Sequence, residues 1–250
     1  MKTRLQTAGV MILALIVLVW LDIYLLNFAI FALALGIAVM ESLKLYDIEN
    51  NDLAIFSVIL FCVFVLFGGG SFASTYKFIL ATILVVSSVL VFKNHESLKP
   101  LLPVFYPMAP IFVMFSVYDV LGMKYLVYML VLVAAADSGA YFVGKLLGSH
   151  SFTPTSPNKT IEGTIGGIVI ATFAGGLYYG IFMDGGLKNP LLATLFIIIA
   201  SIFGDLFESY LKRKAGVKDS GNLFPGHGGM LDRIDSYLFA SIALSLVVSW

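Results

Sequence analysis

Residues 189–235 read NPLLATLFIIIASIFGDLFESYLKRKAGVKDSGNLFPGHGGMLDRID, and this stretch decides the fold class. It joins an apolar run long enough to span a bilayer, a loop dense in charges and glycines, and the start of another apolar run. Charges are costly inside a bilayer, so a charge cluster between two such runs needs a reason. Its cations, carboxylates, glycines and single histidine suit a site for a metal and a polyphosphate better than a simple anchoring loop.

The chain as a whole has the composition of an integral membrane protein. Of the 250 residues, 60% are hydrophobic and 12% are charged, whereas about a quarter are charged in a soluble domain. The formal net charge is zero, which gives no case for binding nucleic acid. The single cysteine, Cys62, excludes an internal disulfide and a cysteine-based zinc site.

Nine apolar segments are candidates for membrane-spanning helices. The first follows Met-Lys-Thr-Arg but shows no clear signal-peptide cleavage site before Asp22, so we expect it to be retained. Four prolines predict a kink in the fifth segment. The predicted fold is an all-α integral membrane protein, a polytopic bundle of about nine transmembrane helices. It forms one membrane-embedded domain over 1–250, with N-terminal helices over about 1–120 and catalytic helices and loops over about 124–250. The segments cover approximately residues 6–22, 24–43, 53–68, 76–93, 100–118, 124–146, 162–183, 189–211 and 231–250.

Lysine and arginine are distributed unevenly between the two sides that such a bundle would have. If nine spans alternate from a cytoplasmic N-terminus, all but three of the 15 Lys and Arg residues, including Lys2 and Arg4, fall on the cytoplasmic side. This bias predicts a multi-pass protein of the cell membrane with a cytoplasmic N-terminus. Its polar loops, 147–161 and 212–230, then face the cytoplasm, where nucleotides are. The three exceptions are Lys77, Lys124 and Lys188.

Two pairs of carboxylates flank the polar loop. Asp205, Glu208 and Lys212 fall within about 60° of one another on a helix, so they share one face. This pattern fits either a Glu208–Lys212 ion pair or a functional site inside the membrane. Asp232 and Asp235 also share a face, and they fit either helix capping or Mg²⁺ binding, because Mg²⁺ prefers hard oxygen ligands.

The segment Pro225-Gly-His227-Gly-Gly229 leads directly into the ninth predicted span. Glycines let backbone N–H groups approach an anion, and a helix N-terminus adds partial positive charge. Beside Lys212, Arg213, Lys218 and Arg233, this loop is a candidate phosphate cradle, although a flexible loop would have the same composition. His227 could contact a phosphate or cap the turn.

A second polar patch covers residues 137–163. Asp137 and Tyr141 lie one helical turn apart. This spacing fits either a functional role or an intrahelical or interhelical hydrogen bond. Lys159 is a natural phosphate ligand, and Ser156 or Thr160 could cap the following helix. Gly163, Gly166 and Gly167 are typical of a small face for close helix packing. His150, within this patch, is predicted to be a solvated loop histidine, and Glu41 and Lys44, outside it, are predicted to be an interfacial pair.

At these residues the chain resembles the phosphatidate cytidylyltransferase (CDP-diacylglycerol synthase) family. Residues 156–163, the segment Asp137–Tyr141 and the opening Lys2-Thr-Arg4 are similar to family motifs, so the resemblance covers nearly the whole chain. Phe224 is a mild departure, since a smaller aliphatic residue is usual there. The signature positions are Ser209, Leu211, Lys212, Arg213, Lys218, Asp219, Gly221, Phe224, Pro225, His227, Gly228, Gly229, Met230, Asp232, Arg233, Ile234 and Asp235.

The resemblance implies transfer of CMP from CTP to phosphatidic acid, giving CDP-diacylglycerol and pyrophosphate in phospholipid biosynthesis. It implies Mg²⁺ as cofactor, leaves a second, monovalent cation open, and implies a homodimer among membrane lipids. The expected catalytic residues are Lys212, Asp205 and Asp232. The expected substrate-binding residues are Ser156, Lys159, Arg213, Lys218, Asp219, His227, Gly228, Gly229 and Arg233. The expected metal ligands are Asp205, Asp232 and Asp235, supported by Asp137, Glu162 and Glu208.

Two other functions use some of the same groups. A CTP-dependent kinase of polyprenol or diacylglycerol needs a similar metal and phosphate site, but it would release CDP instead of pyrophosphate. An anion transporter would be favoured by charges at the bilayer midplane and by an inverted repeat. The acids here lie near one face, and no repeat is visible.

Overall fold

The computed structural model describes residues 2–49 and 52–248, with the side chains of residues 2–8 outside the description. The side chains of Lys2 and Arg4, and the last two residues of the ninth predicted span, therefore lie outside the described residues. The chain divides into two compact units. Unit 1 comprises Met1–Val120 and Lys214–Ile234, and unit 2 comprises Leu121–Arg213 and Asp235–Trp250. The segment 214–234, which contains most of the polar loop, thus belongs to the same unit as the N-terminal helices.

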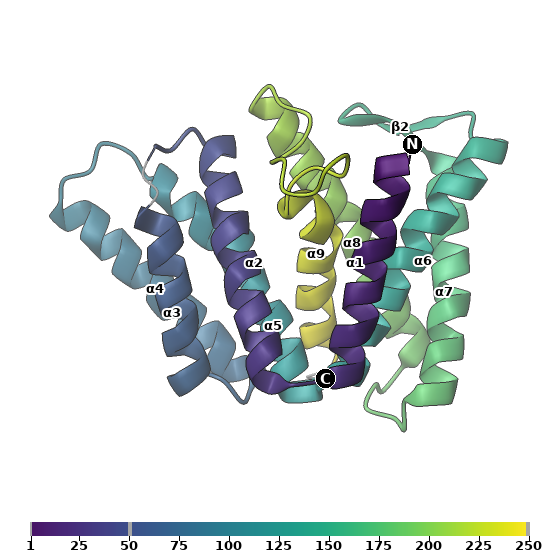
Figure 1. The fold of residues 1–250 in the computed structure, drawn as a ribbon, viewed down its shortest axis with the longest axis horizontal. Helices are drawn as coiled ribbons and strands as arrows, with labels where there is room; N and C mark the ends of the chain where they lie inside the picture. The colour runs from purple at the N-terminus through teal and green to yellow at the C-terminus, as the bar shows by residue number, and fades with distance from the viewer. Residues whose placement is uncertain (1, 50–51, 249–250) are drawn as a thin grey trace. The chain divides into compact units, whose positions relative to one another are not determined.

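Unit 1 consists of apolar helices joined by short turns (Figure 1). The turn between the first two helices is only two residues long, and Asp22 adopts the left-handed conformation there with φ 41°. Ser71 caps α4 by accepting a hydrogen bond from the Ser74 amide at 3.1 Å. The elements are α1 (Lys2–Leu21), α2 (Tyr24–Leu45), α3 (Asp52–Phe67), α4 (Phe72–Phe92), η1 (Lys99–Leu101), η2 (Val104–Met108) and α5 (Ala109–Leu121).

The kink predicted from the prolines is confirmed. η2 is a π-helical turn containing Pro107, and Tyr106 within it has the extended angles φ −152° and ψ 116°. The core of unit 1 is aromatic: the rings of Phe64 and Phe112 stack at 5.0 Å, and those of Phe61 and Phe115 meet edge to face at 5.1 Å. These fully buried rings hold α3 against α5.

Unit 2 is built around two long helices that pack side by side, α6 (Met123–Leu147) and α7 (Ile161–Phe182) (Figure 1). Their glycines bring the backbones together. A Cβ at Gly163 would lie 2.7 Å from the Ala140 carbonyl oxygen, and one at Gly167 would lie 2.6 Å from that of Ala136. The predicted packing role of these glycines is therefore confirmed.

A short hairpin joins these two helices, and the all-helical prediction did not include it. Strand β1 (Ser151–Thr153) pairs antiparallel with β2 (Ser156–Thr160). At the end of β2, the Thr160 hydroxyl accepts a hydrogen bond from the Gly163 amide at 3.1 Å and caps α7. Of the two predicted caps, Thr160 is the one used. α8 (Pro190–Lys214) follows, and α9 (Leu231–Val248) begins in unit 1 and continues in unit 2.

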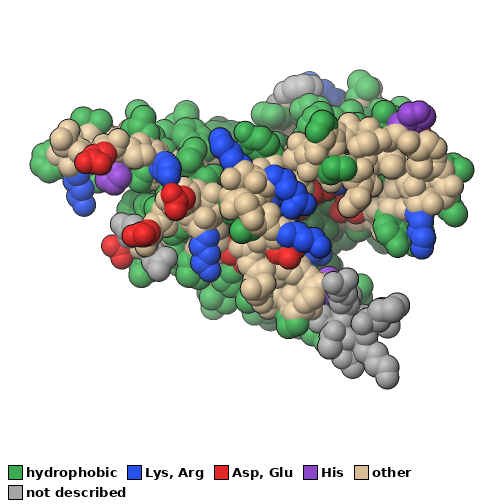
Figure 2. Space-filling model, turned by 90° about the horizontal axis from the view of Figure 1, so that it is seen from above, with side chains coloured by type: hydrophobic (Ala, Val, Ile, Leu, Met, Phe, Trp, Pro, Cys, Tyr) green, Lys and Arg blue, Asp and Glu red, His purple; other side chains and the backbone are tan. Residues whose placement is uncertain are grey.

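Helices occupy most of the described part of each predicted apolar segment, with η1 and η2 at the start of the fifth. Six stretches among the described residues are long and apolar enough to cross a membrane. Large apolar side chains are exposed on both units: Phe92 is 91% exposed and Phe173 is 70% exposed, as expected for side chains that face lipid. The face drawn in Figure 2 also carries Lys, Arg, Asp and Glu side chains. The chain is therefore a polytopic helical membrane protein. The six stretches are Tyr24–Leu45, Phe72–Phe92, Lys99–Leu121, Met123–Leu147, Ile161–Phe182 and Pro190–Lys214.

Candidate functional site

In unit 2, the hairpin brings Lys159 to α8. The ammonium of Lys159 pairs with the Asp205 carboxylate, and both side chains are partly buried, with 31% and 24% of their surfaces exposed. Ser209, one turn further along α8, donates a hydrogen bond to Asp205 at 3.4 Å. Two residues that the sequence predicted for one site, from segments 46 positions apart, are therefore in contact.

The electrostatic surroundings of Lys159 include three more predicted residues of unit 2. Burial lowers the pKa of the Lys159 ammonium below its ordinary value, while the negative charges of Asp137 and Asp235 oppose this shift and the positive charge of Lys212 adds to it. Carboxylates from α6, α8 and α9 thus act on one lysine. Such a cluster of charges is typical of a functional site.

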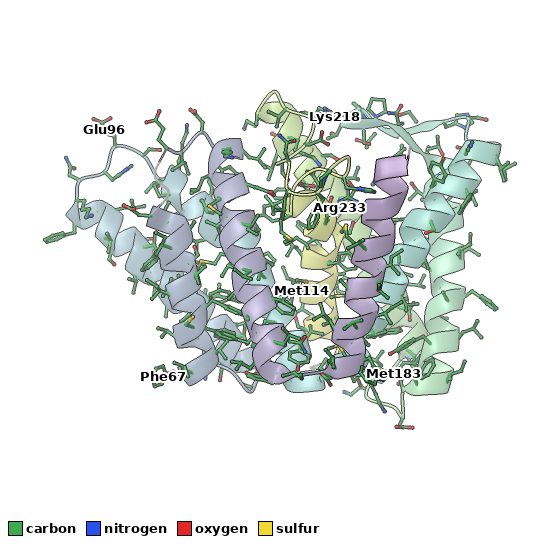
Figure 3. All side chains as sticks on the ribbon, in the orientation of Figure 1. Phe67, Glu96, Met114, Met183, Lys218 and Arg233 are labelled. Atoms are coloured by element: carbon green, nitrogen blue, oxygen red, sulfur yellow. The ribbon has the colours of Figure 1, made fainter. Side chains whose placement is uncertain are left out.

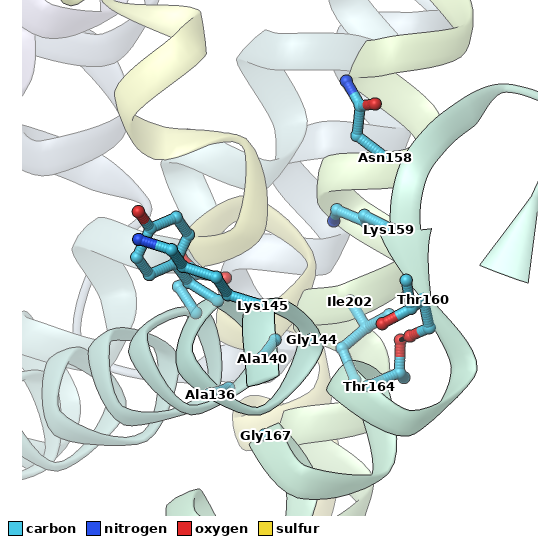
Figure 4. A pocket seen from close by; sticks show the side chains of 12 residues that line it. Ala136, Ala140, Gly144, Lys145, Asn158, Lys159, Thr160, Thr164, Gly167 and Ile202 are labelled. Carbon is cyan, nitrogen blue, oxygen red and sulfur yellow. Dashed lines mark hydrogen bonds between the residues drawn. The ribbon is translucent and has the colours of Figure 1, made fainter. Parts of the chain in front are cut away.

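A pocket of about 360 Å³ lies beside this cluster (Figure 4). Polar residues of α6, β2 and α7 line it: Asp137, Tyr141, Lys145, Asn158, Lys159, Thr160 and Thr164. Ile202, alanines and glycines supply much of its apolar wall, and Figure 4 shows Lys159 and Asn158 projecting from the hairpin strand. Polar groups that converge on an apolar cavity are the usual form of a small-molecule site.

The predicted ion pair within α8 is present. Lys212 donates to Glu208 at 3.0 Å, and the Glu208 side chain is fully buried while that of Lys212 is 12% exposed. Burial of a carboxylate without a positive partner is strongly unfavourable, so this pair fixes the rotamer of Lys212. The structural alternative is thus confirmed, and it is compatible with a functional role for Lys212.

Other predicted residues of this region organise the hairpin. Glu162 accepts hydrogen bonds from the Ser149 amide at 3.1 Å and the His150 amide at 3.3 Å, and it contacts His150 Nδ1 at 2.6 Å. His150 is a loop histidine with a side chain that is 76% exposed, as predicted, and it pairs with Glu162 in addition. Ser156 pairs through its backbone with Thr153, and Lys159 of the same strand reaches the pocket.

In unit 1, the contacts of Glu41 differ from the predicted pairing with Lys44. Its carboxylate is 5% exposed and accepts hydrogen bonds, each 2.9 Å long, from the Met230 amide, the Leu231 amide and the Ser220 hydroxyl. The interfacial pairing with Lys44 is wrong, because Glu41 points to the start of α9. The signal that could have found it is an acid at the end of an apolar run, which requires a buried partner.

Asp232 completes this arrangement. One of its oxygens accepts from the Gly229 amide at 2.7 Å, the Ser220 amide at 2.8 Å and the Ser220 hydroxyl at 2.9 Å. Asp232 and Glu41 together accept hydrogen bonds from the amides of Gly229, Met230 and Leu231. The backbone donors that the sequence offered to a phosphate are bonded to the protein's own carboxylates in this conformation.

The glycines here make room for a side chain. A Cβ at Gly221 or Gly229 would overlap the Glu41 carboxylate, and Gly228 has the positive φ of 82°. The preceding turn is closed by the His227 amide, which donates to the Phe224 carbonyl at 2.8 Å. Nδ1 of His227 is buried and has no hydrogen-bond partner among the described residues.

The remaining predicted cations are exposed. Lys218 and Arg233 in unit 1 and Arg213 in unit 2 extend into the surroundings, as does Asp219. Figure 3 shows Lys218 and Arg233 at the end of unit 1 that also carries Glu96, whereas Phe67 lies at the opposite end. These exposed cations are accessible to an anionic ligand.

The predicted metal ligands belong to both units: Asp205 and Asp235 to unit 2, and Asp232 to unit 1. Among the described residues, no group of three or more His, Cys, Asp or Glu side chains could by itself hold a metal ion. The acids of unit 2 are hard oxygen donors, and Mg²⁺ is commonly held by one or two carboxylates together with substrate phosphates and water. The donors around Lys159 fit that ion.

Residues 2–250 match the sequence profile described as the cytidylyltransferase family. The chain is 37% identical over 243 residues to a protein named phosphatidate cytidylyltransferase from Helicobacter pylori strain ATCC 700392 / 26695, covering 97% of this chain and 90% of that protein. A protein of the same name from Helicobacter pylori strain J99 is 37% identical over 247 residues, covering 99% and 91%. Another from Bacillus subtilis strain 168 is 50% identical over 126 residues, covering 48% and 46%. This chain therefore belongs to the cytidylyltransferase family.

Proposed function

We propose that this protein is a phosphatidate cytidylyltransferase, which transfers CMP from CTP to phosphatidate and releases pyrophosphate. The observation that carries the proposal is the identity of 37% to a phosphatidate cytidylyltransferase across 97% of the chain. The polar pocket of unit 2, in a protein with apolar helices long enough to span a membrane, agrees with a reaction between a nucleotide and a lipid.

In the proposed reaction, an oxygen of the lipid phosphate attacks the α-phosphorus of CTP. A new P–O bond forms there, and the bond from the α-phosphorus to the oxygen bridging it to the β-phosphate breaks, so pyrophosphate leaves with that electron pair. The lipid phosphate is already ionised near pH 7, because its second pKa is about 6, and a protein base is not required. No covalent intermediate with a protein side chain is required either.

The main task of the protein is to bring two anions together. In unit 2, Lys159 and Lys212 would bind phosphate oxygens, and their ion pairs with Asp205 and Glu208 hold both ammonium groups in place beforehand. Arg213 would add charge from the same unit, and the substrate-binding roles of Lys218 and Arg233 in unit 1 stay predictions from the sequence. Positive charge fixed before the reaction stabilises the transition state because it needs no reorganisation.

We further propose that Asp205 and Asp235 hold Mg²⁺ in unit 2, which would neutralise phosphate charge during the transfer. Asp232, the third predicted ligand, organises the loop of unit 1 through its hydrogen bonds, and its part in metal binding stays a prediction. Asp137 supports the site by its negative charge near Lys159.

We propose the orientation expected from the lysine and arginine bias, with nine spans, a cytoplasmic N-terminus and a cytoplasmic polar site in the cell membrane. The common position of Lys218, Arg233 and Glu96 at one end of unit 1 supports a single polar side for that unit (Figure 3). A homodimer remains a proposal from the resemblance.

The test uses purified protein with phosphatidate, Mg²⁺ and CTP labelled with ³²P at either the α or the γ position, followed by chromatography of the lipids. Cytidylyl transfer labels the lipid from α-labelled CTP only and releases labelled pyrophosphate from γ-labelled CTP. A lipid kinase, assayed with diacylglycerol or polyprenol in place of phosphatidate, would label that lipid from γ-labelled CTP only. Absence of lipid label from α-labelled CTP would refute the proposal.

A further inference from the structure

The N-terminus of α9 already holds an anion, and that anion is a side chain of α2. The first amides of a helix lack partners within the helix and carry partial positive charge. In unit 1, the Glu41 carboxylate fills this position by accepting from the Met230 and Leu231 amides at 2.9 Å. Glu41 lies 190 positions before Leu231, so a distant helix supplies the cap.

Glu41 is joined to the rest of the loop through Ser220. The Ser220 hydroxyl lies 2.9 Å from both Glu41 and Asp232, and Asp232 accepts from the Gly229 amide. The two carboxylates therefore hold the loop 220–231 at both of its ends. We call the set Glu41, Ser220, Gly229 and Asp232 the carboxylate clasp.

The shape of the loop depends on the clasp for a steric reason as well. Gly221 and Gly229 have no room for a Cβ because the Glu41 carboxylate fills the space. Between these glycines, the turn closed by Phe224 and His227 carries the His227 ring, whose Nδ1 is buried without a partner among the described residues. A buried polar atom without a partner is rare in folded proteins and calls for an explanation, and a bond to a ligand that reorders the ring would supply one.

We propose that Glu41 is a positioning residue for nucleotide binding: through the carboxylate clasp it holds the loop 220–231 in the shape that presents His227 to CTP. This inference rests on the proposed function, since it assumes that CTP is the ligand of this loop. Glu41 itself does not contact the substrate in this account, because its oxygens are occupied by the loop.

The test compares Glu41→Gln and Ser220→Ala with the parent protein. A glutamine has the same size, but its NH₂ group cannot accept, so either the Met230 amide or the Leu231 and Ser220 donors lose their acceptor, and the remaining donors keep only a neutral one. We expect KM for CTP to rise about tenfold, a typical loss for a charge-assisted hydrogen bond, while KM for phosphatidate changes less than about twofold. Glu96→Gln, an exposed acid of the same unit, is the matched control and should leave both constants unchanged.

A second measurement needs no substrate. Amide hydrogen exchange of a peptide covering residues 224–231 should be faster in Glu41→Gln, because the Met230 and Leu231 amides lose their charged acceptor. It should also be faster in Ser220→Ala, because the hydroxyl that joins Glu41 to Asp232 is lost, and it should be unchanged in Glu96→Gln. If Glu41→Gln does not fold, Ser220→Ala is judged by the same criteria. Unchanged exchange, an unchanged KM for CTP, or an equal rise of both Michaelis constants would overturn the proposal. Failure of the parent protein to label lipid from CTP would instead refute the proposed function, and the exchange comparison would still test the clasp.

Discussion

Gly167→Ala should destabilise unit 2, although alanine is a better helix former than glycine. A Cβ at this position would lie 2.6 Å from the Ala136 carbonyl oxygen and 3.1 Å from the Ala140 amide nitrogen, where ordinary contacts begin at 3.4 Å. The first of these partners is backbone and cannot rotate away. Helices α6 and α7 must therefore separate by roughly 0.8 Å, the difference between the first distance and an ordinary contact.

Separation on that scale removes roughly a quarter to a half of the dispersion energy of each contact along the helix pair. Overpacking of this kind costs about 1–3 kcal/mol in protein cores, which exceeds the gain of up to about 1 kcal/mol from replacing a helical glycine. Because Ala136 and Gly167 also line the pocket, we expect cytidylyl transfer to fall together with stability.

Gly176→Ala, on the same helix, is the matched control. Nothing lies within 4 Å of its Cβ position, so this variant should be as stable as the parent or more stable by up to about 1 kcal/mol. Thermal unfolding of both purified variants in the same detergent measures the difference. Equal unfolding midpoints, or a more stable Gly167→Ala protein, would refute the close packing of α6 on α7.

Lys159→Met should lower kcat/KM for cytidylyl transfer by about 10²–10³, the usual loss for one preorganised charge. Lys188→Met, at an exposed lysine, is the control and should leave kcat/KM unchanged. Equal kcat/KM values for Lys159→Met and the parent protein would remove Lys159 from the mechanism. Asp205→Asn should abolish cytidylyl transfer and weaken Mn²⁺ binding measured by electron paramagnetic resonance. Asp184→Asn, at an exposed carboxylate, is the control. Near-normal turnover of Asp205→Asn would exclude Asp205 as a metal ligand. Thr160→Ala should lower the stability of α7 by about 1 kcal/mol, seen as a lower unfolding midpoint, because the Gly163 amide loses its cap; an unchanged midpoint would contradict that role.

The positions of the helices could be predicted from the sequence because each apolar run has one stable state in a bilayer. Its backbone groups must be bonded internally, so 20 or so apolar residues become a helix whatever they pack against. The kink at Pro107 and the glycine contacts of Gly167 follow from the same local rules. The hairpin at 151–160 was not predicted, because its strands are too short and too polar to show an alternating pattern.

The chemistry of the site could be predicted in part. Lys159 and Asp205 were both singled out, but only the fold shows that they meet. Glu41 was missed, because its partners are amides and a hydroxyl more than 170 positions away, and backbone groups leave no mark in a sequence. For the same reason, the glycines of the loop suggested an open phosphate cradle, whereas Gly229 makes room for a carboxylate.

The carboxylate clasp has a consequence for the thermodynamics of binding. A loop that folds only around its ligand loses conformational entropy at the moment of binding, and this loss subtracts from the affinity. Here Glu41 and Asp232 order the loop 220–231 while the protein folds, before a nucleotide arrives. The protein thus separates the entropy loss of loop ordering from ligand binding, and more of the contact energy with a nucleotide remains available as affinity.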